Sequence, residues 1–291
     1  MALELIEDLA TWRGALDASR AAGLSVGVVP TMGALHGGHM SLIRRAAAEC
    51  DVAVLTDYVN PLQFGPSEDL GAYPKNLGRD CELAAEAGAQ LMLAPSPAHV
   101  WPDGEPSTSV HVAGLTDRLE GEARPGHFDG VTTIVCKLLS LSGPCRAYFG
   151  EKDYQQLAVV TRMVRDLSLP AQVVGCPTVR EADGLALSSR NAYLAPEERA
   201  VASRLYHSLL AGKRLIEEEA VTDPARVEAA VAEHLSVEKR FALDYAAVVN
   251  PTDFNRPASI GFVEVRLLAA ARLGKARLID NMSATPAAAQ Q

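Results

Sequence analysis

The chain has 291 residues and a mass of 30.9 kDa, a length typical of about two domains. It carries 36 aspartates and glutamates against 27 lysines and arginines, and this formal net charge of −9 argues against a general nucleic-acid binder. With 48% hydrophobic and 22% charged residues, the composition is that of an ordinary globular protein and excludes disorder as the main state.

The five cysteines are scattered and form no CxxC pair, which disfavours a disulfide framework and a zinc ribbon. We therefore expect reduced thiols in a cytoplasmic protein. Residues 1–8 are acidic and do not resemble a signal peptide, and no apolar run approaches the ~20 residues of a membrane span. Neither a nucleic acid nor a membrane is expected as a partner.

The first part of the chain alternates short apolar runs, which are typical of strands, with segments of helical spacing. We expect strands at 24–29, 52–59, 90–94, 146–149 and 171–174, and helices over 39–48, 131–141 and 154–167. This alternation predicts an α/β fold, a Rossmann-like parallel sheet with helices on both faces.

The pattern changes after Cys176. A loop-like stretch at 177–194 precedes a long helix that starts near Pro196, and a second helix follows near Pro224. Short strands at 243–249, 262–269 and 276–279 then suggest a smaller α+β C-terminal domain. We place a Rossmann-like domain at residues 1–175, the smaller domain at 176–282 and a frayed, disordered tail at 283–291.

The segment from Val29 to Met40 joins the end of a predicted strand to the start of a helix. Ligands of open α/β sheets bind at the carboxyl ends of strands, and a helix N-terminus suits phosphate. Gly37 and Gly38 allow close approach of the backbone, and His36 and His39 share one face of a first helical turn. These residues favour phosphate chemistry. A P-loop is excluded because no lysine follows Gly38, and a zinc site would need a further ligand near the two histidines.

Three further stretches carry polar side chains beside predicted elements. Asn60 and Gln63 could fix a small polar substrate, but this stretch taken alone favours a purely structural polar turn around Pro61. At 149–156, Lys152 offers a charge for phosphate, and Asp153 could cap the helix or hold ribose or Mg²⁺. At 179–191, two serines and an arginine suit either a mobile phosphate clamp or a solvated linker. A Gly/Pro turn at 119–128 shows no readable function.

Taken together, these stretches resemble the pantothenate synthetase (pantoate–β-alanine ligase) family, a branch of the HxGH nucleotidyltransferase superfamily. The family patterns PTMGxLHxGH, FVNPxQFGPxED, LEGxxRPGHFxGV, FGEKDxQQL, VREXDGLAxSSRNxYL and LIDN stand in order at residues 30–39, 58–69, 119–131, 149–157, 179–194 and 278–281. The departures are small, with Asp57 and Tyr58 where the family usually has apolar residues, Cys145 where aspartate is common and Leu187 for a frequent methionine.

The resemblance implies that ATP, pantoate and β-alanine are converted to pantothenate, AMP and pyrophosphate through a pantoyl-adenylate, with Mg²⁺ and in a homodimer. It implies catalytic roles for His36, His39, Lys152, Ser188, Ser189 and Arg190, with His39 as a proton donor. Gln63, Gln156 and Asn60 would bind pantoate, and Gln63 would also bind β-alanine. ATP would be bound by Met32, Gly33, Ala34, Leu35, His36, Gly37, Gly38, His39, Gly150, Glu151, Lys152, Asp153, Val179, Leu187, Ser188, Ser189 and Arg190. No residue is assigned to a protein metal site.

Three other functions are considered from the residues. Another HxGH-type nucleotidyltransferase with a different acceptor would keep the histidine motif and the serine–arginine loop, but would not need the NPxQ and EKDxQQ stretches. A tRNA synthetase fits less well, because the chain is short and acidic. A non-catalytic nucleotide-binding protein would bind ATP without turnover.

Overall fold

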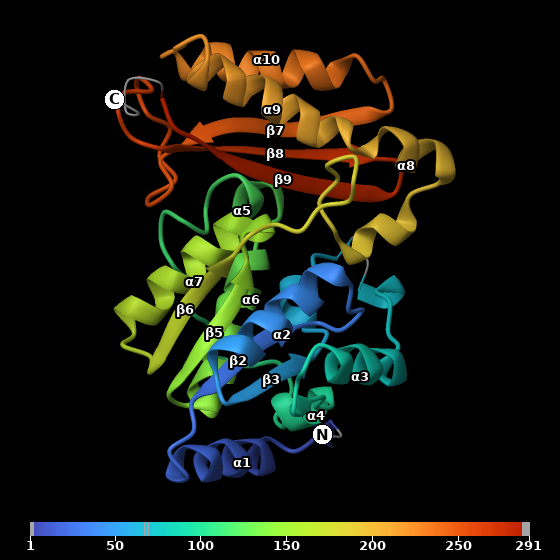
Figure 1. The fold of residues 1–291 in the computed structure, drawn as a ribbon, viewed down its shortest axis with the longest axis vertical. Coiled ribbons are helices and arrows are strands. Elements are labelled where there is room, and N and C mark those ends of the chain that lie inside the picture. Colours follow the sequence, from blue (N-terminus) through green and yellow to red (C-terminus); the bar gives the residue numbers. More distant parts are fainter. Residues whose placement is uncertain (1–2, 67, 69, 287–291) are drawn as a thin grey trace. The chain divides into compact units, whose positions relative to one another are not determined.

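The computed structural model describes residues 3–66, 68 and 70–286, and the chain divides into two compact units. The first unit comprises Met1–Glu151 and Gln156–Pro177, and the second comprises Lys152–Gln155 and Thr178–Gln291. Figure 1 shows a larger sheet flanked by helices in the first unit and a smaller sheet covered by helices in the second.

Six strands form the sheet of the first unit, in the spatial order β1, β4, β3, β2, β5, β6. Each neighbouring pair is parallel. The strands are β1 (Glu4–Ile6), β2 (Val26–Thr31), β3 (Val52–Asp57), β4 (Leu91–Leu93), β5 (Cys145–Gly150) and β6 (Ala171–Cys176). The predicted parallel sheet is therefore confirmed.

Helices cover both faces of this sheet. On one face, α2 (Gly37–Glu49) and α3 (Leu77–Glu86) share an apolar cluster with strand residues such as Leu55 and Tyr148. On the other face, α6 (His127–Ser142) contacts β2 and β5, and Trp12 of α1 (Leu9–Ala21) donates a hydrogen bond to Ser142 of α6. The remaining helical segments between β3 and β6 are η1 (Pro61–Gln63), η2 (Leu70–Ala72), α4 (Pro97–Val100), α5 (Glu120–Ala123), η3 (Glu151–Asp153) and α7 (Tyr154–Asp166).

The strand order changes direction between β2 and β5. From β2 the chain proceeds through β3 to β4 on one side, and β5 and β6 lie on the other. Such a switch point separates the loops that follow the two central strands and opens a crevice for ligands at their carboxyl ends. The loop after Thr31 and the turn after Gly150 therefore start from the position where this fold class binds ligands.

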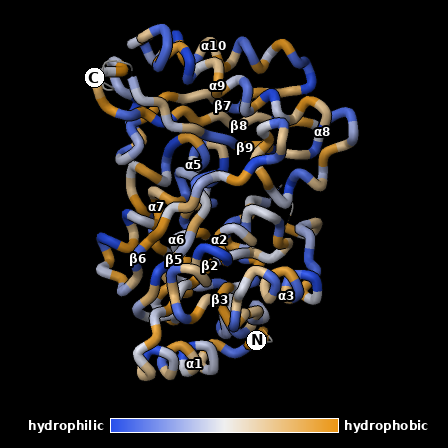
Figure 2. Tube along the Cα trace, viewed as in Figure 1, coloured by the Kyte–Doolittle hydropathy of each residue, from blue (hydrophilic) through white to orange (hydrophobic). Residues whose placement is uncertain are grey.

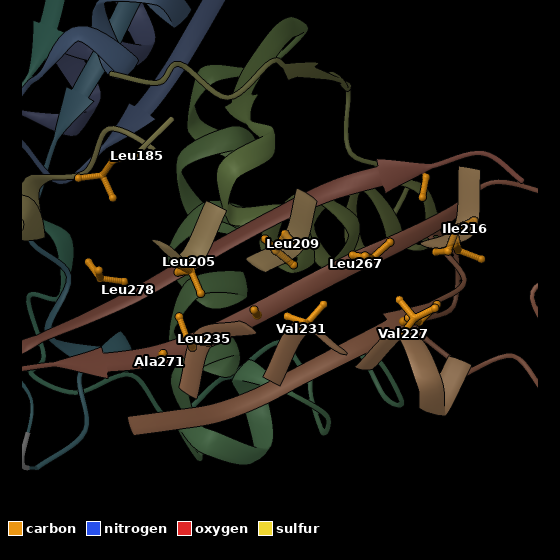
Figure 3. Close-up of a cluster of buried hydrophobic side chains, with 14 of the residues drawn as sticks. Leu185, Leu205, Leu209, Ile216, Val227, Val231, Leu235, Leu267, Ala271 and Leu278 are labelled. Carbon is orange, nitrogen blue, oxygen red and sulfur yellow. The ribbon is translucent and has the colours of Figure 1, made fainter. Parts of the chain in front are cut away.

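The second unit is built on the antiparallel sheet of β7 (Phe241–Val249), β8 (Val265–Leu273) and β9 (Ala276–Ala284). Helices α9 (Arg204–Glu217) and α10 (Pro224–Ser236) bury one stripe each against it, with Leu209 and Val231 among the buried residues (Figure 3). A Cβ at Gly212 would lie 2.6 Å from Val231 Cγ2, so the packing of α9 on α10 requires glycine there. The unit also contains η4 (Ser189–Tyr193) and α8 (Pro196–Ala202).

Hydrophobic and hydrophilic residues alternate along α9 and α10, as Figure 2 shows, because only one side of each helix faces the sheet. In the part of the chain that the structure describes, no helix is long and apolar enough to span a membrane. The five cysteines, all within the described ranges, are free thiols.

Several predicted boundaries need correction. Ser283 and Ala284 pair with β8 as the end of β9, so these two residues are not part of a frayed tail; residues 287–291 of that predicted tail lie outside the described residues. Phe262 and Val263 are exposed and precede β8, which starts at Val265. The long helix predicted from Pro196 is two helices, α8 and α9.

Candidate active site

The loop between β2 and α2 is shaped at its start by the side-chain hydroxyl of Thr31. Thr31 Oγ1 donates to the Thr56 carbonyl at 2.6 Å, and it accepts from Gly33 N at 3.1 Å. Gly33 has a φ of +76°, and a Cβ there would overlap with Asp57 Oδ1. Only glycine fits this turn, because both the backbone angle and the available space exclude a side chain.

A buried carboxylate from a distant helix holds the next two residues of the loop. Asp80 of α3 is 2% exposed, and its two oxygens accept hydrogen bonds from Ala34 N at 3.0 Å and Leu35 N at 2.7 Å. Ala34 has a φ of +49°, so the turn needs external support. The sequence analysis did not identify Asp80, because its partners lie 46 and 45 residues away in the chain.

His36 and His39 lie together at the start of α2. Their ring centroids are 4.1 Å apart, and both residues are partly exposed. His36 is the N-cap residue, and its Nδ1 accepts a hydrogen bond from Gly38 N at 3.1 Å. This ring nitrogen therefore carries no proton, and a neutral His36 has its hydrogen on Nε2. The predicted pairing of the two histidines on one helical turn is present in the structure.

Asn60 and Gln63 form a buried amide pair after β3. Asn60 Nδ2 donates to Gln63 Oε1 at 3.2 Å and to the Gly130 carbonyl at 3.1 Å, and Gln63 Nε2 lies 2.9 Å from Met32 Sδ. Asn60 is 1% exposed and Gln63 9%. Asn60 thus orients Gln63, and the contact with Met32 brings Gln63 to the β2–α2 loop. The chain does turn at Pro61, as η1, and the two amide side chains of this turn are buried.

Residues 119–128, the Gly/Pro turn to which the sequence assigned no function, hold the main chain of Gln63. Arg124 makes two hydrogen bonds of 2.7 Å to the carboxylate of Glu68, and a third from Nη1 to His127 Nε2 at 2.9 Å. Because arginine only donates, His127 accepts at Nε2 and donates from Nδ1 to the Gln63 carbonyl at 2.8 Å. Burial, and then the neighbouring Arg124, lowers the pKa of His127 to about 4, so this histidine is neutral.

In the second unit, the main chain at Lys152 is fixed by the last strand. Asn281 of β9 is 3% exposed, and its Nδ2 donates to the Lys152 carbonyl at 2.8 Å while its Oδ1 accepts from Arg266 Nε at 2.8 Å. Lys152 Nζ lies 3.5 Å from Asp153 Oδ1. The closing LIDN stretch thus has a structural role that its sequence did not indicate: it positions the lysine.

The same strand also holds the loop that carries Val179. Asp280, beside Asn281, accepts hydrogen bonds from both terminal nitrogens of Arg180, at 2.6 and 2.8 Å. Leu187 N donates to the Val179 carbonyl at 3.0 Å, and Ser188 Oγ caps η4 by accepting from Arg190 N at 3.3 Å. Val179, Leu187, Ser188, Ser189 and Arg190 therefore belong to one ordered loop of the second unit.

The predicted site residues are thus divided between the units. The first unit brings together the loop from Met32 to His39 with Asn60 and Gln63, and it contains Gly150, Glu151 and Gln156. The second unit contains Lys152 and Asp153 together with the loop of Val179 and residues 187–190. That both groups serve one site remains a prediction.

The second unit also contains a cavity of about 400 Å³ that includes none of these predicted residues. Its lining comes from α8, α9 and α10 and includes Arg204, His207 and His234. Arg204 donates to the His234 carbonyl at 3.1 Å. The described residues contain no group of three or more His, Cys, Asp or Glu side chains placed to hold a metal ion.

Residues 4–283 match the sequence model of the pantoate-beta-alanine ligase family. The chain is 47% identical over 280 residues to the pantothenate synthetase of Moorella thermoacetica, an alignment that covers 96% of this chain and 98% of that protein. The crystal structure of pantothenate synthetase from Thermus thermophilus matches with a TM-score of 0.91 at 46% identity, covering 97% of this chain and 100% of that one. Pantoate-beta-alanine ligase from Francisella tularensis, complexed with beta-gamma ATP and beta-alanine, matches with a TM-score of 0.79 at 32% identity and 97% coverage of both chains.

Proposed function

The chain belongs to the pantoate–β-alanine ligase family, and we propose that it joins pantoate to β-alanine at the expense of ATP. The observation that carries the proposal is the family match over residues 4–283, which includes every residue of the candidate site. The complex of the Francisella tularensis relative with beta-gamma ATP and beta-alanine supports two of the three substrates.

The reaction proceeds in two steps. An oxygen of the pantoate carboxylate attacks the α-phosphorus of ATP, the bond to the β-phosphate breaks, and pyrophosphate leaves. The amine of β-alanine then attacks the acyl carbon of the pantoyl-adenylate, forms the C–N bond and loses a proton, and AMP leaves. Attack of one anion on another is slow without groups that shield the negative charge, so the first step places the stronger demand on the protein.

The predicted catalytic residues have the chemistry that this step demands. Lys152 and Arg190 supply positive charge to the phosphates, and Ser188 and Ser189 supply hydroxyl donors. His36 and His39 act from the start of α2, where the helix dipole also favours an anion, and His39 is the proton donor of the pair. The loop from Met32 to His39, with Gly150, Glu151, Asp153, Val179 and Leu187, binds the remainder of ATP.

Pantoate binds by neutral hydrogen bonds. Gln63 and Gln156 are its partners, and Gln63 also contacts β-alanine. Asn60 acts through Gln63, since its side-chain nitrogen donates to Gln63 Oε1. A neutral amide suits this task because it orients the substrate without forming an ion pair with the attacking carboxylate.

Mg²⁺ enters as part of the nucleotide substrate. The ion binds phosphate oxygens and water readily and needs only one or two carboxylates from a protein. Asp153 is the carboxylate that stands beside Lys152. We further propose that the enzyme works in the cytoplasm as a homodimer.

Pantoate-dependent exchange of labelled pyrophosphate into ATP tests the proposal. With Mg²⁺ and without β-alanine, we expect exchange only when pantoate is present. Exchange with another carboxylate, and none with pantoate, would favour a nucleotidyltransferase with a different acceptor. Binding of ATP without any exchange in a screen of carboxylates would contradict catalysis altogether.

A further inference from the structure

A pair of carboxylates lies behind the loop from Met32 to His39, and neither has a role in the proposed chemistry. Asp80 comes from α3 and Asp57 from the end of β3. Asp80 accepts one hydrogen bond from the backbone N–H of Ala34 and one from that of Leu35, and Asp57 lies directly against Gly33. Together the two side chains contact three successive residues of the loop.

We propose that Asp80 is a positioning residue for nucleotide binding, and that Asp57, which lies against Gly33 of the same loop, couples this positioning to pH through its own charge. The proposal rests on the assignment of residues 32–39 to ATP. Both carboxylates contact the loop, and neither is assigned a contact with the substrate.

The geometry gives Asp80 a defined task. Its two oxygens accept hydrogen bonds of 3.0 and 2.7 Å from adjacent N–H groups, in a turn where Ala34 has a φ of +49°. A carboxylate accepts two such bonds at once, one on each oxygen, which a side-chain amide with its single oxygen cannot reproduce. Loss of this partner would leave two backbone donors without their acceptor, that of Leu35 buried and that of Ala34 partly buried, and would release the turn that precedes His36.

Asp57 makes this arrangement sensitive to pH. Burial, and then the charge and hydrogen bond of Asp80, raises the pKa of Asp57 to about 6, and Lys75 opposes the rise. Cys81 on α3 also lies near the pair, and its own pKa is raised by burial and by both aspartates, so it stays neutral near pH 7. Lys75 is therefore a cation that opposes the rise in the pKa of Asp57.

The expected direction follows from these charges. Below pH 6, Asp57 is mostly protonated and adds no charge to the loop. Above pH 6, the Asp57 carboxylate is ionised beside Gly33 and adds negative charge near a site for a polyanion. ATP should bind more weakly in the ionised state, and by linkage ATP should favour protonation of Asp57.

The test measures ATP dissociation constants by calorimetry between pH 5.5 and 8.5 for the unmodified chain and for Asp57→Asn. The substituted amide is neutral at every pH and can still donate to Asp80. ATP and the histidines titrate in both proteins alike. Their effect therefore cancels when the ATP dissociation constant of the unmodified chain is divided by that of the variant. We expect this ratio to rise about fivefold or more across the range. A constant ratio would overturn the role of Asp57.

Asp80→Asn tests the positioning role, because it keeps one acceptor oxygen and the size of the side chain. We expect weaker ATP binding and a higher KM for ATP, with a smaller change in kcat and in the KM for pantoate. Unchanged ATP affinity in a folded Asp80→Asn protein would overturn the role of Asp80. Asp51→Asn is the matched control, since Asp51 accepts from Ser25 N and Ser25 Oγ at the opposite end of β3.

The pyrophosphate exchange assay separates this inference from the proposed function. If the unmodified chain shows no pantoate-dependent exchange, the proposed function fails. If the unmodified chain shows normal exchange, and Asp57→Asn and Asp80→Asn bind ATP with the same affinity as the unmodified chain at every pH, only the present inference fails.

Discussion

Lys152 combines a fixed main chain with a charged side chain that only partly faces solvent. Asn281 holds its carbonyl at 2.8 Å, and its side chain is 19% exposed. We expect Lys152→Ala to lower the single-turnover rate of adenylate formation by ~10²-fold or more, as for loss of one transition-state donor, and His39→Ala to do the same. Rapid-quench measurements with labelled ATP provide the rates.

Lys275→Ala is the control for Lys152, because Lys275 is an exposed lysine of the same unit in the turn between β8 and β9. Its rate should equal that of the unmodified chain. A near-normal rate in Lys152→Ala or His39→Ala would remove that residue from the catalytic set.

Gln63 is the residue through which the amide pair should recognise pantoate. We expect Gln63→Ala to weaken pantoate binding by about tenfold, the loss of roughly one good hydrogen bond, and to change ATP binding much less. Calorimetry with each ligand separately measures both effects. Gln172→Ala in β6 removes an exposed glutamine and should change neither. Equal losses of pantoate and ATP affinity in Gln63→Ala would contradict the assignment.

Asp57 should also make stability depend on pH. Its folded pKa of about 6 lies above the ordinary value of 3.8, so its favourable contribution is complete below pH 3.8 and is lost as pH rises through 6. This difference corresponds to an upper value of about 3 kcal/mol. We therefore expect Asp57→Asn to unfold at a higher urea concentration than the unmodified chain at pH 8, with the difference shrinking toward pH 4. An equal difference at both pH values would exclude titration of Asp57 as its cause.

At the scale of elements, the close approach of α6 to η1 depends on a single glycine. A Cβ at Gly130 would overlap with the Leu62 carbonyl oxygen and would lie 2.6 Å from Gln63 N. We expect Gly130→Ala to destabilise the chain by about 1–3 kcal/mol and to weaken pantoate binding, because the helix and the Gln63 turn must separate.

A second glycine in a helix gives the opposite expectation. A Cβ added at Gly14 in α1 would have no atom within 4 Å, so Gly14→Ala should stabilise the chain by about 0.5–1 kcal/mol. Urea unfolding of both variants measures the two effects. Similar stability changes in the two variants would show that the contact with η1 is not the cause.

The elements differed in how well the sequence predicted them. β2 and β3 were predictable because strands buried on both faces are apolar along most of their length. α3 was not predicted, because one of the residues that it buries is the charged Asp80, which accepts a hydrogen bond from the loop after β2. α1 buries only Trp12 and Leu16, which is too short a repeat to show helical periodicity, although Asp8 as its N-cap residue was a usable signal.

At the scale of the whole molecule, the sequence suggested the parts of a candidate site but not the residues that hold them in place. Each predicted stretch follows a strand or precedes a helix, a local property that spacing and glycines can indicate. The contacts of Arg124 with Gln63, of Asn281 with Lys152 and of Asp80 with Ala34 join residues 61, 129 and 46 positions apart. Such pairs are set by topology, and no local pattern of one sequence predicts them.

The central claim is that pantoate is activated by transfer of AMP to its carboxylate. Pantoate labelled with ¹⁸O in the carboxyl group tests it most directly, in a complete reaction with ATP, Mg²⁺ and β-alanine analysed by mass spectrometry. Attack on the α-phosphorus predicts that one labelled oxygen appears in AMP for each pantothenate formed. Label in inorganic phosphate, with ADP as the nucleotide product, would show attack on the γ-phosphate and would contradict the adenylate mechanism.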